Sequence, residues 1–156
     1  MKISVYFFGL LLVLINSADC FAQNVVKKTP PNSEIGTLST QYLKSSPAFA
    51  EVLLRKTELL AEVESLLVTY TEDFPRVQQV RYELNVLNTE LTGLLKVKSE
   101  EREKLTLALG KLIVRKAELE TDYWNLKTKY GDEHPDVKRA KRKTEIYAKA
   151  IKDVLG

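Results

Sequence analysis

The sequence predicts an all-α fold made of two tandem antiparallel helical hairpins that share a long middle helix. Three observations lead to this prediction. Gly and Pro are scarce, with 6 and 5 among 156 residues, while 29% of the chain is charged, a composition that favours long helices over sheets. Apolar residues alternate at spacings of three and four, which is typical of helices packing at a 3.5-residue period. The same pattern then occurs twice along the chain.

Residues 1–22 have the features of a secretory signal peptide. Lys2 provides a positive start, an apolar run covers 5–15, and Cys20 and Ala22 place small residues at the −3 and −1 positions of a cleavage site. The apolar run is shorter than the roughly 20 residues of a membrane-spanning helix, which makes an uncleaved anchor the less favoured interpretation. Lipid attachment at Cys20 also fits poorly, because Asp19 directly precedes it. We therefore expect an exported protein, periplasmic or secreted.

Cleavage after Ala22 would remove the one cysteine of the chain, and with it any disulfide, thiolate nucleophile or Cys-ligated metal. Residues 23–45 are polar, contain two prolines and a glycine, and show no apolar period, which predicts a flexible linker. The folded domain is expected over 46–156, with repeat 1 at 46–105 and repeat 2 at 106–156.

The folded domain is a tandem duplication at a gapless offset of 60 residues. Charged, turn and apolar positions recur together, which favours duplication of one hairpin unit over chance. Identical pairs include Arg55 and Arg115, Glu58 and Glu118, Leu59 and Leu119, Leu66 and Leu126, Tyr70 and Tyr130, Pro75 and Pro135, and Val77 and Val137. The apolar seam predicted for repeat 1 consists of Val52, Leu59, Val63, Leu66, Tyr70, Val77, Val80, Leu84, Leu87, Leu91 and Leu94.

The first helix is expected to start with Ser46 as cap and Pro47 as first residue, and to run to about Tyr70. Between Pro75 and Tyr130 there is no proline, and Lys96–Lys104 strongly favours helix. We therefore expect a continuous middle helix of roughly 80 Å, whose halves pair with the first helix and with a last helix at 136–154. The alternative bends the middle near Ser99 and closes a four-helix bundle.

Two turns, Tyr70–Val77 and Tyr130–Val137, are expected to close the hairpins. Proline suits the first turn of the helix that follows, and Gly131 is expected to end the preceding helix in the left-handed conformation. Thr71 replaces this glycine in repeat 1, which leaves open whether both turns close alike. The tyrosines are predicted to plug the core at the hairpin tips. Structural roles in the turns are assigned to Tyr70, Pro75, Val77, Tyr130, Gly131, Pro135 and Val137.

The stretch Lys129-Tyr130-Gly131-Asp132-Glu133-His134-Pro135-Asp136-Val137, with the charged helix that follows, resembles a known family. It is similar to the periplasmic coiled-coil region of bacterial polysaccharide chain-length-determinant and exopolysaccharide-export proteins, where a Tyr-(Gly/Thr)-x-x-His-Pro-x-Val turn joins two long helices. Members usually carry a second membrane helix, and some a kinase domain; this sequence shows no second apolar segment and no phosphate-binding loop. The resemblance implies a coiled-coil module of the bacterial envelope.

Three features compete as functional sites with ordinary packing roles. His134, the one histidine, lies among acidic residues, but one histidine in one short loop is a poor transition-metal site, so a role in the turn is favoured. Trp124 suits either flank packing, which is favoured, or an exposed anchor for sugar or protein. A basic stretch offers contact to an anionic polysaccharide, lipid headgroups or phosphates, with a solvated face as the favoured alternative. The basic stretch is Lys138, Arg139, Lys141, Arg142 and Lys143.

No catalytic, cofactor-binding or metal-binding residue set is predicted, and a hidden hydrolase is the least favoured hypothesis. Apolar residues off the seam predict a homo-oligomer or a partner helix: Leu53, Leu54, Leu60, Leu67, Leu95, Leu109 and Ile113. The leading hypothesis is a non-enzymatic exported coiled-coil scaffold or adaptor of the bacterial cell envelope, linked to polysaccharide export, with a protein, polysaccharide or membrane-protein partner. The alternative is a periplasmic holding chaperone for unfolded or anionic clients. Nucleic acid is disfavoured by the export signal.

Overall fold

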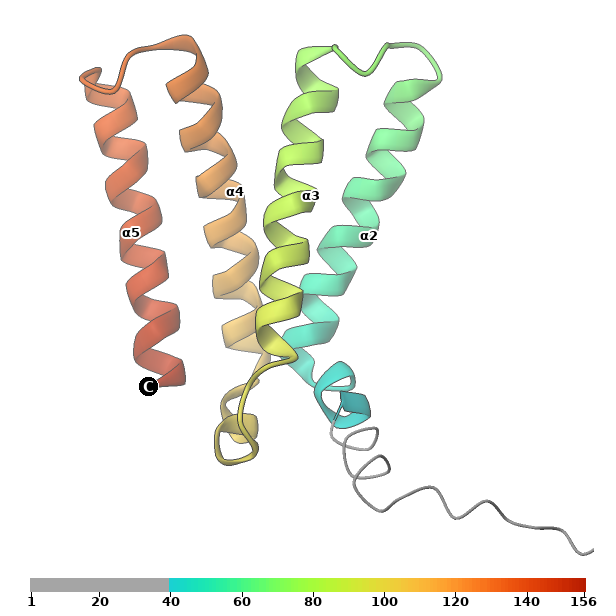
Figure 1. Ribbon diagram of the computed structural model, residues 1–156, viewed down its shortest axis with the longest axis vertical. Coiled ribbons are helices and arrows are strands. Elements are labelled where there is room, and N and C mark those ends of the chain that lie inside the picture. Colours follow the sequence, from blue (N-terminus) through green and yellow to red (C-terminus); the bar gives the residue numbers. More distant parts are fainter. Residues whose placement is uncertain (1–39) are drawn as a thin grey trace, which may run out of the picture.

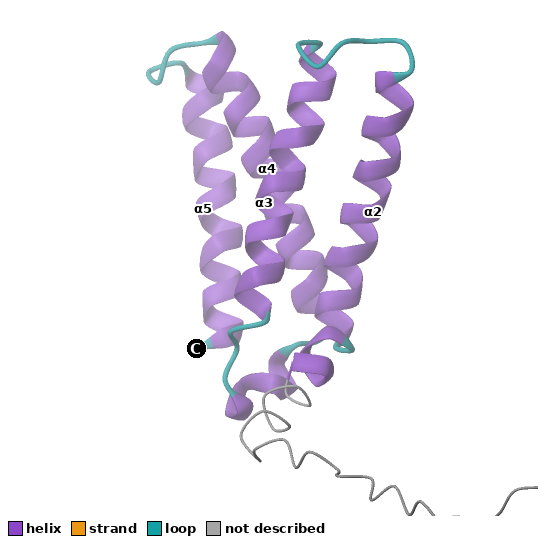
Figure 2. Cartoon of the chain, turned by 45° about the vertical axis from the view of Figure 1, so that its right-hand side comes forward, coloured by secondary structure: helices purple, strands orange, loops and turns teal. Residues whose placement is uncertain are grey.

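The computed structural model describes residues 40–156, and this part of the chain is helical without strands. Four long helices follow one another: α2 (Pro47–Leu67), α3 (Pro75–Leu94), α4 (Leu107–Lys129) and α5 (Pro135–Leu155), with a short 3-10 helix η1 (Ser99–Lys104) before α4 (Figures 1 and 2). Helices α2 and α3 form one antiparallel hairpin, and α4 and α5 form the other. The two hairpins meet at one end and separate toward their tips (Figure 1). The predicted all-α fold of two hairpins is confirmed.

The prediction of a continuous middle helix is wrong. Helix α3 ends at Leu94, and the chain passes through η1 before α4 begins at Leu107, so the bend near Ser99 is the alternative that holds. The bend brings the hairpins together and buries Leu105, Leu109 and Ile113, which are 0–2% exposed. Each such side chain contributes about 1.5–3 kcal/mol on burial. Continuing the helix through the bend would add only a few tenths of a kcal/mol per residue in intrinsic propensity.

The two hairpins begin in the same way. The Ser46 Oγ atom accepts a hydrogen bond from the N–H of Phe49 at 3.3 Å, and the Thr106 Oγ1 atom accepts one from the N–H of Leu109 at 3.3 Å. The cap expected at Ser46 is therefore present, and its repeat equivalent, Thr106, starts α4. Helix α2 ends at Leu67, before the expected Tyr70.

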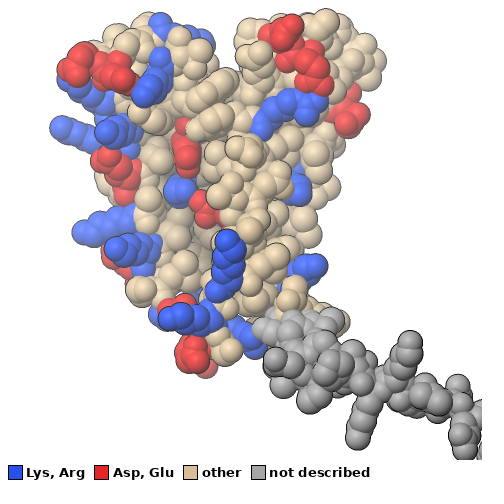
Figure 3. Space-filling model, in the orientation of Figure 1, with Lys and Arg blue, Asp and Glu red and all other residues tan. Residues whose placement is uncertain are grey.

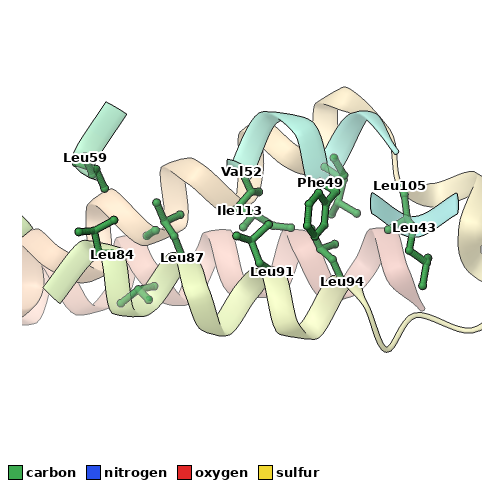
Figure 4. Packing of buried hydrophobic residues seen from close by; sticks show 14 of the residues in the cluster. Leu43, Phe49, Val52, Leu59, Leu84, Leu87, Leu91, Leu94, Leu105 and Ile113 are labelled. Atoms are coloured by element: carbon green, nitrogen blue, oxygen red, sulfur yellow. The ribbon is translucent and has the colours of Figure 1, made fainter. Parts of the chain in front are cut away.

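The hydrophobic core lies where α2, α3 and α4 meet (Figure 4). Helix α4 packs against α2, α3 and α5, whereas α5 packs mainly against α4. The predicted seam of repeat 1 is buried except for Leu66 and Tyr70. In α5 only Val137 and Ala140 are buried. Among the residues off the seam, Leu109 and Ile113 are buried, whereas Leu53, Leu54 and Leu60 remain exposed.

The prediction of a flexible linker over 23–45 is wrong for its last residues. Residues 40–44 are helical and Leu43 is 3% exposed, because its side chain joins the core near Leu105 at the base of the bundle (Figure 4). The predicted signal peptide at 1–22 and the linker residues 23–39 lie outside the described residues.

Candidate functional site

Both hairpin tips close with the same backbone hydrogen bonds. In the second tip the N–H of Tyr130 donates to the carbonyl of Leu126 at 2.8 Å, and the N–H of His134 donates to the carbonyl of Gly131 at 3.0 Å. The two equivalent bonds of the first tip, from Tyr70 and Phe74, have the same lengths. Glycine is therefore not what closes the turn, because Thr71 in the first tip supports the same hydrogen bond as Gly131 in the second.

Two expectations for the tips are wrong. Gly131 does not adopt the left-handed conformation, because Gly156 is the one glycine among residues 40–156 with a positive φ. Tyr70 and Tyr130 do not plug the core, because they are 44% and 46% exposed. Each tyrosine lies in the turn, past the last residue of its helix, Leu67 in α2 and Lys129 in α4. Each instead stacks on the aromatic side chain four residues later.

His134 has a structural role in the second tip. Its ring stacks on Tyr130 with centroids 4.4 Å apart, and its Nδ1 atom accepts a hydrogen bond from the N–H of Asp136 at 3.2 Å, which caps α5. In the first tip Phe74 stacks on Tyr70 at 4.0 Å. Within residues 40–156 no group of three or more His, Cys, Asp or Glu side chains is placed to hold a metal ion.

Trp124 packs on a flank of the bundle. Its ring stacks on Tyr82 of α3, with centroids 4.7 Å apart and planes 13° apart. The side chain is half-buried and joins α4 to α3. This is the flank-packing role favoured for Trp124, and the stacked face of the indole is not available to a sugar.

The basic stretch of α5 does not form one patch. Arg139 and Lys143 line a hollow between α4 and α5 beside Leu119, whereas Lys138 and Lys141 line the opposite side of the hairpin beside Tyr123. Two of the five cations are paired locally. Lys138 forms an ion pair with Glu133 at 2.5 Å. Arg139 pairs with Asp136, and its hydrogen bond lowers the pKa of the Asp136 carboxyl.

Three cations of the basic stretch, Lys141, Arg142 and Lys143, form no ion pair within residues 40–156. All three are exposed. Positive side chains gather along the α5 edge of the molecule in Figure 3. The first hairpin, 47–94, has four basic and eight acidic residues, a net charge of −4; the second, 107–155, has twelve basic and eight acidic residues, a net charge of +4.

A groove between α4 and α5 was not predicted from the sequence. Its basal part is largely apolar, is lined by Ala108, Lys111, Leu112, Arg115 and Tyr147, and has a volume of about 470 Å³. Ile146 lies one residue from the groove-lining Tyr147 and is 66% exposed. A signal for this surface was present: 60 residues earlier, the equivalent Val86 is an apolar residue off the predicted seam.

No helix within residues 40–156 is both long and apolar enough to span a membrane. The chain matches no protein-family model, no curated protein and no solved structure. Within residues 40–156 the candidate surfaces are the tips, the exposed cations of α5 and the α4–α5 groove.

Proposed function

We propose that the protein is a non-enzymatic, exported scaffold of the bacterial cell envelope that binds an anionic polymer, such as an envelope polysaccharide, through the outer face of α5. We define this outer face as Lys138, Lys141, Arg142, Lys149 and Lys152. These residues are all exposed and recur at helical spacing on a helix that is covered mainly by α4. This row of cations is the observation that carries the proposal.

The form of the row favours a polymer over a small anion. The cations extend along most of α5, a helix of 21 residues and therefore about 30 Å. A single exposed ion pair contributes about 1 kcal/mol or less, so useful affinity requires several contacts at once. A chain with regularly spaced negative charges provides them. Binding of this kind weakens as salt increases.

The envelope location has separate support. The first 22 residues have the composition of an export signal, and the turn Tyr130–Val137 resembles that of polysaccharide chain-length-determinant proteins. The two hairpins also separate toward their tips, so each tip and its helices present surface to partners (Figure 3). Such an arrangement suits a scaffold that holds a polymer near other envelope components.

The test compares two variants with equal loss of charge. In one, Lys141, Lys149 and Lys152 are each changed to Gln; in the control, Lys56, Lys96 and Lys127 are changed to Gln. Binding of the protein, expressed from its full coding sequence, to immobilised polygalacturonate is measured at low and high salt, with neutral dextran as the negative probe. We expect the outer-face variant to lose about tenfold or more in affinity and the control about twofold or less.

Equal loss in both variants, or equal binding to dextran, would overturn the proposal. A second arm uses a photo-crosslinking residue at Lys141 in intact cells, with Arg81, its repeat equivalent, as the matched position. Capture of polymer or of an envelope protein from position 141 alone supports the scaffold. Suppression of the aggregation of unrelated unfolded proteins, without polymer binding, would instead support the holding chaperone.

A further inference from the structure

The two hairpins of one chain are joined by a helix lying in a groove. Helix α4 packs across both α2 and α3 of the first hairpin. A Cβ atom on Gly110 would lie 2.8 Å from Cβ of Glu51 and 3.0 Å from Cα of Ala48, so α4 approaches α2 closely there. Further along α4, Lys116 pairs with Glu90 of α3 at 2.6 Å. The α2–α3 groove is therefore filled by α4.

The α4–α5 groove is the repeat equivalent of this filled groove. Its lining residues Ala108, Lys111, Leu112, Arg115 and Tyr147 lie 60 positions after Ala48, Glu51, Val52, Arg55 and Leu87. The exposures differ because no helix of residues 40–156 lies in the second groove. Val52 and Leu87 are 0% exposed, whereas Leu112 and Tyr147 are half-buried.

Ile146 shows the difference most clearly. It is 66% exposed, while its repeat equivalent Val86 is 8% exposed. Val86 of α3 lines the same hollow as Lys116 and Glu120 of α4, so α4 covers it. Ile146 therefore occupies a position built to be covered by a helix, and within residues 40–156 none covers it.

A helix face that matches the open groove is present on α2. The side of α4 that enters the first groove includes Gly110, Ile113 and Ala117, of which Ile113 is 1% exposed. Sixty residues earlier the same side of α2 carries Ala50, Leu53 and Thr57, followed by Leu60. Leu53 and Leu60 are 43% and 45% exposed. The first hairpin thus exposes the helix face on α2, and the second hairpin exposes the groove between α4 and α5.

We propose that a second copy of this chain fills the α4–α5 groove with its own α2, so that copies associate head to tail. The contact continues the interface that already joins the two hairpins within one chain. Because the two surfaces that meet are different, the interface does not close on itself in a dimer, and further copies can add at both ends.

Charge favours this arrangement. The first hairpin, at net −4, would meet the second hairpin of the neighbouring copy, at net +4. Within one chain the Nη2 atom of Arg55 lies 3.9 Å from the Oε1 atom of Glu118 across the hairpin interface. The repeat equivalents, Arg115 and the second copy's Glu58, would form the same pair. Tyr82 stacks on Trp124 across the same interface. Their repeat equivalents are Arg142 and the second copy's Glu64, which would form a second pair of opposite charge.

One substitution between the repeats sets the strength of the contact. Ala50 stands where α4 has Gly110, and its methyl group would meet Lys111 and Ala108 of the groove. The docked α2 must therefore lie slightly further out than α4 does, which loses part of the contact. The association between copies is expected to be weaker than the packing within one chain, and to depend on protein concentration and on salt.

The test uses the protein expressed from its full coding sequence and sedimentation velocity over about 1 to 100 μM. Leu53→Glu changes the α2 face, Ile146→Glu changes the groove, and Asn88→Glu adds the same charge at an exposed site on α3 as the control. We expect the parent and the control to grow in mass with concentration and each interface variant to stay monomeric. An equimolar mixture of the two interface variants retains one intact face and one intact groove, so it should form dimers and nothing larger.

Three results would overturn the proposal: a monomeric parent throughout, loss of association in only one of the two variants, or a mixture that stays monomeric. Loss in Leu53→Glu alone would indicate that α2 pairs with α2. Circular dichroism of each variant checks that the helices persist. The association uses Arg142 but not Lys141, Lys149 or Lys152, the residues changed in the polymer-binding test, so this proposal and the polymer-binding proposal fail independently.

Discussion

Arg55 on α2 donates two hydrogen bonds to one carboxylate oxygen of Glu83 on α3, from Nε at 3.0 Å and from Nη2 at 2.9 Å. Glu83 is 7% exposed. Burial raises the pKa of Glu83, and the hydrogen bonds and charge of Arg55 oppose that rise without cancelling it. The buried carboxylate in the middle of the first hairpin is thus tolerable only with its guanidinium partner.

Arg55→Met is expected to destabilise the protein by about 3 kcal/mol at pH 7, because it leaves the Glu83 carboxylate buried without its partner. This is the lower end of the usual range, since the Arg55 side chain is 29% exposed. The double variant Arg55→Met/Glu83→Leu should return to within about 1 kcal/mol of the parent. Urea denaturation followed by circular dichroism measures both. A single variant as stable as the double would contradict the expectation.

The cost of Arg55→Met should also depend on pH. Because the folded pKa of Glu83 lies above its ordinary value of 4.5, the folded protein binds more protons than the unfolded chain above that pH. Stability therefore falls as pH rises through the folded pKa, and the penalty disappears below 4.5. The difference in unfolding free energy between Arg55→Met and the double variant, which lacks the carboxyl, should shrink from pH 7 to pH 4.5. A constant difference would argue against a buried, charged Glu83.

The caps at Ser46 and Thr106 give a test of the bend. Ser46→Ala and Thr106→Ala should each cost about 1 kcal/mol, because each removes the acceptor for a backbone N–H at a helix start. Thr57→Ala is the control, since the Thr57 hydroxyl donates to the carbonyl of Leu53 in mid-helix and caps nothing. In a continuous middle helix Thr106→Ala would be stabilising, because alanine has the higher helix propensity. Thermal unfolding distinguishes the two signs.

The middle of the chain shows where local sequence information ends. The spacing of Val77, Val80 and Leu84 predicts a helix face, because that periodicity depends only on neighbours in sequence. Lys96–Lys104 also favours helix locally, yet the chain bends there, since the burial of Leu109 and Ile113 between hairpins is a long-range gain. The repeat contained a sign of the bend, because Thr106 is the equivalent of the cap Ser46.

The candidate surfaces were predicted less completely than the core. The apolar seam predicts that Tyr130 faces the partner helix, but not that Tyr130 lies beyond the end of α4 and stacks on His134 instead. The five basic residues within 138–143 lie close together in sequence, which suggests one patch. A helix nevertheless distributes them around its circumference. The α4–α5 groove depends on α4 covering one hairpin and not the other, which no local pattern contains.

His134→Phe is expected to change stability by no more than about 0.5 kcal/mol. The first tip already uses Phe74 in the same stack, and Phe74 provides no side-chain cap to α3. The variant would lose the weak hydrogen bond from Asp136 and retain the aromatic contact with Tyr130. Chemical denaturation at pH 7 measures the change. A loss above about 1 kcal/mol would show that the cap, rather than the stack, holds the second tip.

Gly110→Ala and Gly93→Ala test the close approach of α4 to α2. Gly93 lies in α3 with nothing within 4 Å of an added Cβ atom, so alanine there should stabilise the protein by about 1 kcal/mol through helix propensity. The same methyl group on Gly110 would lie 3.0 Å from the Cα atom of Ala48, part of a backbone that yields only if α2 and α4 separate. Separation would weaken the packing around Ile113, so we expect a net loss of about 1–2 kcal/mol. If Gly110→Ala proved as stabilising as Gly93→Ala in urea denaturation, the hairpins would not pack through this contact. The proposal that a second copy docks its α2 in the α4–α5 groove, which is patterned on this contact, would then lose its basis.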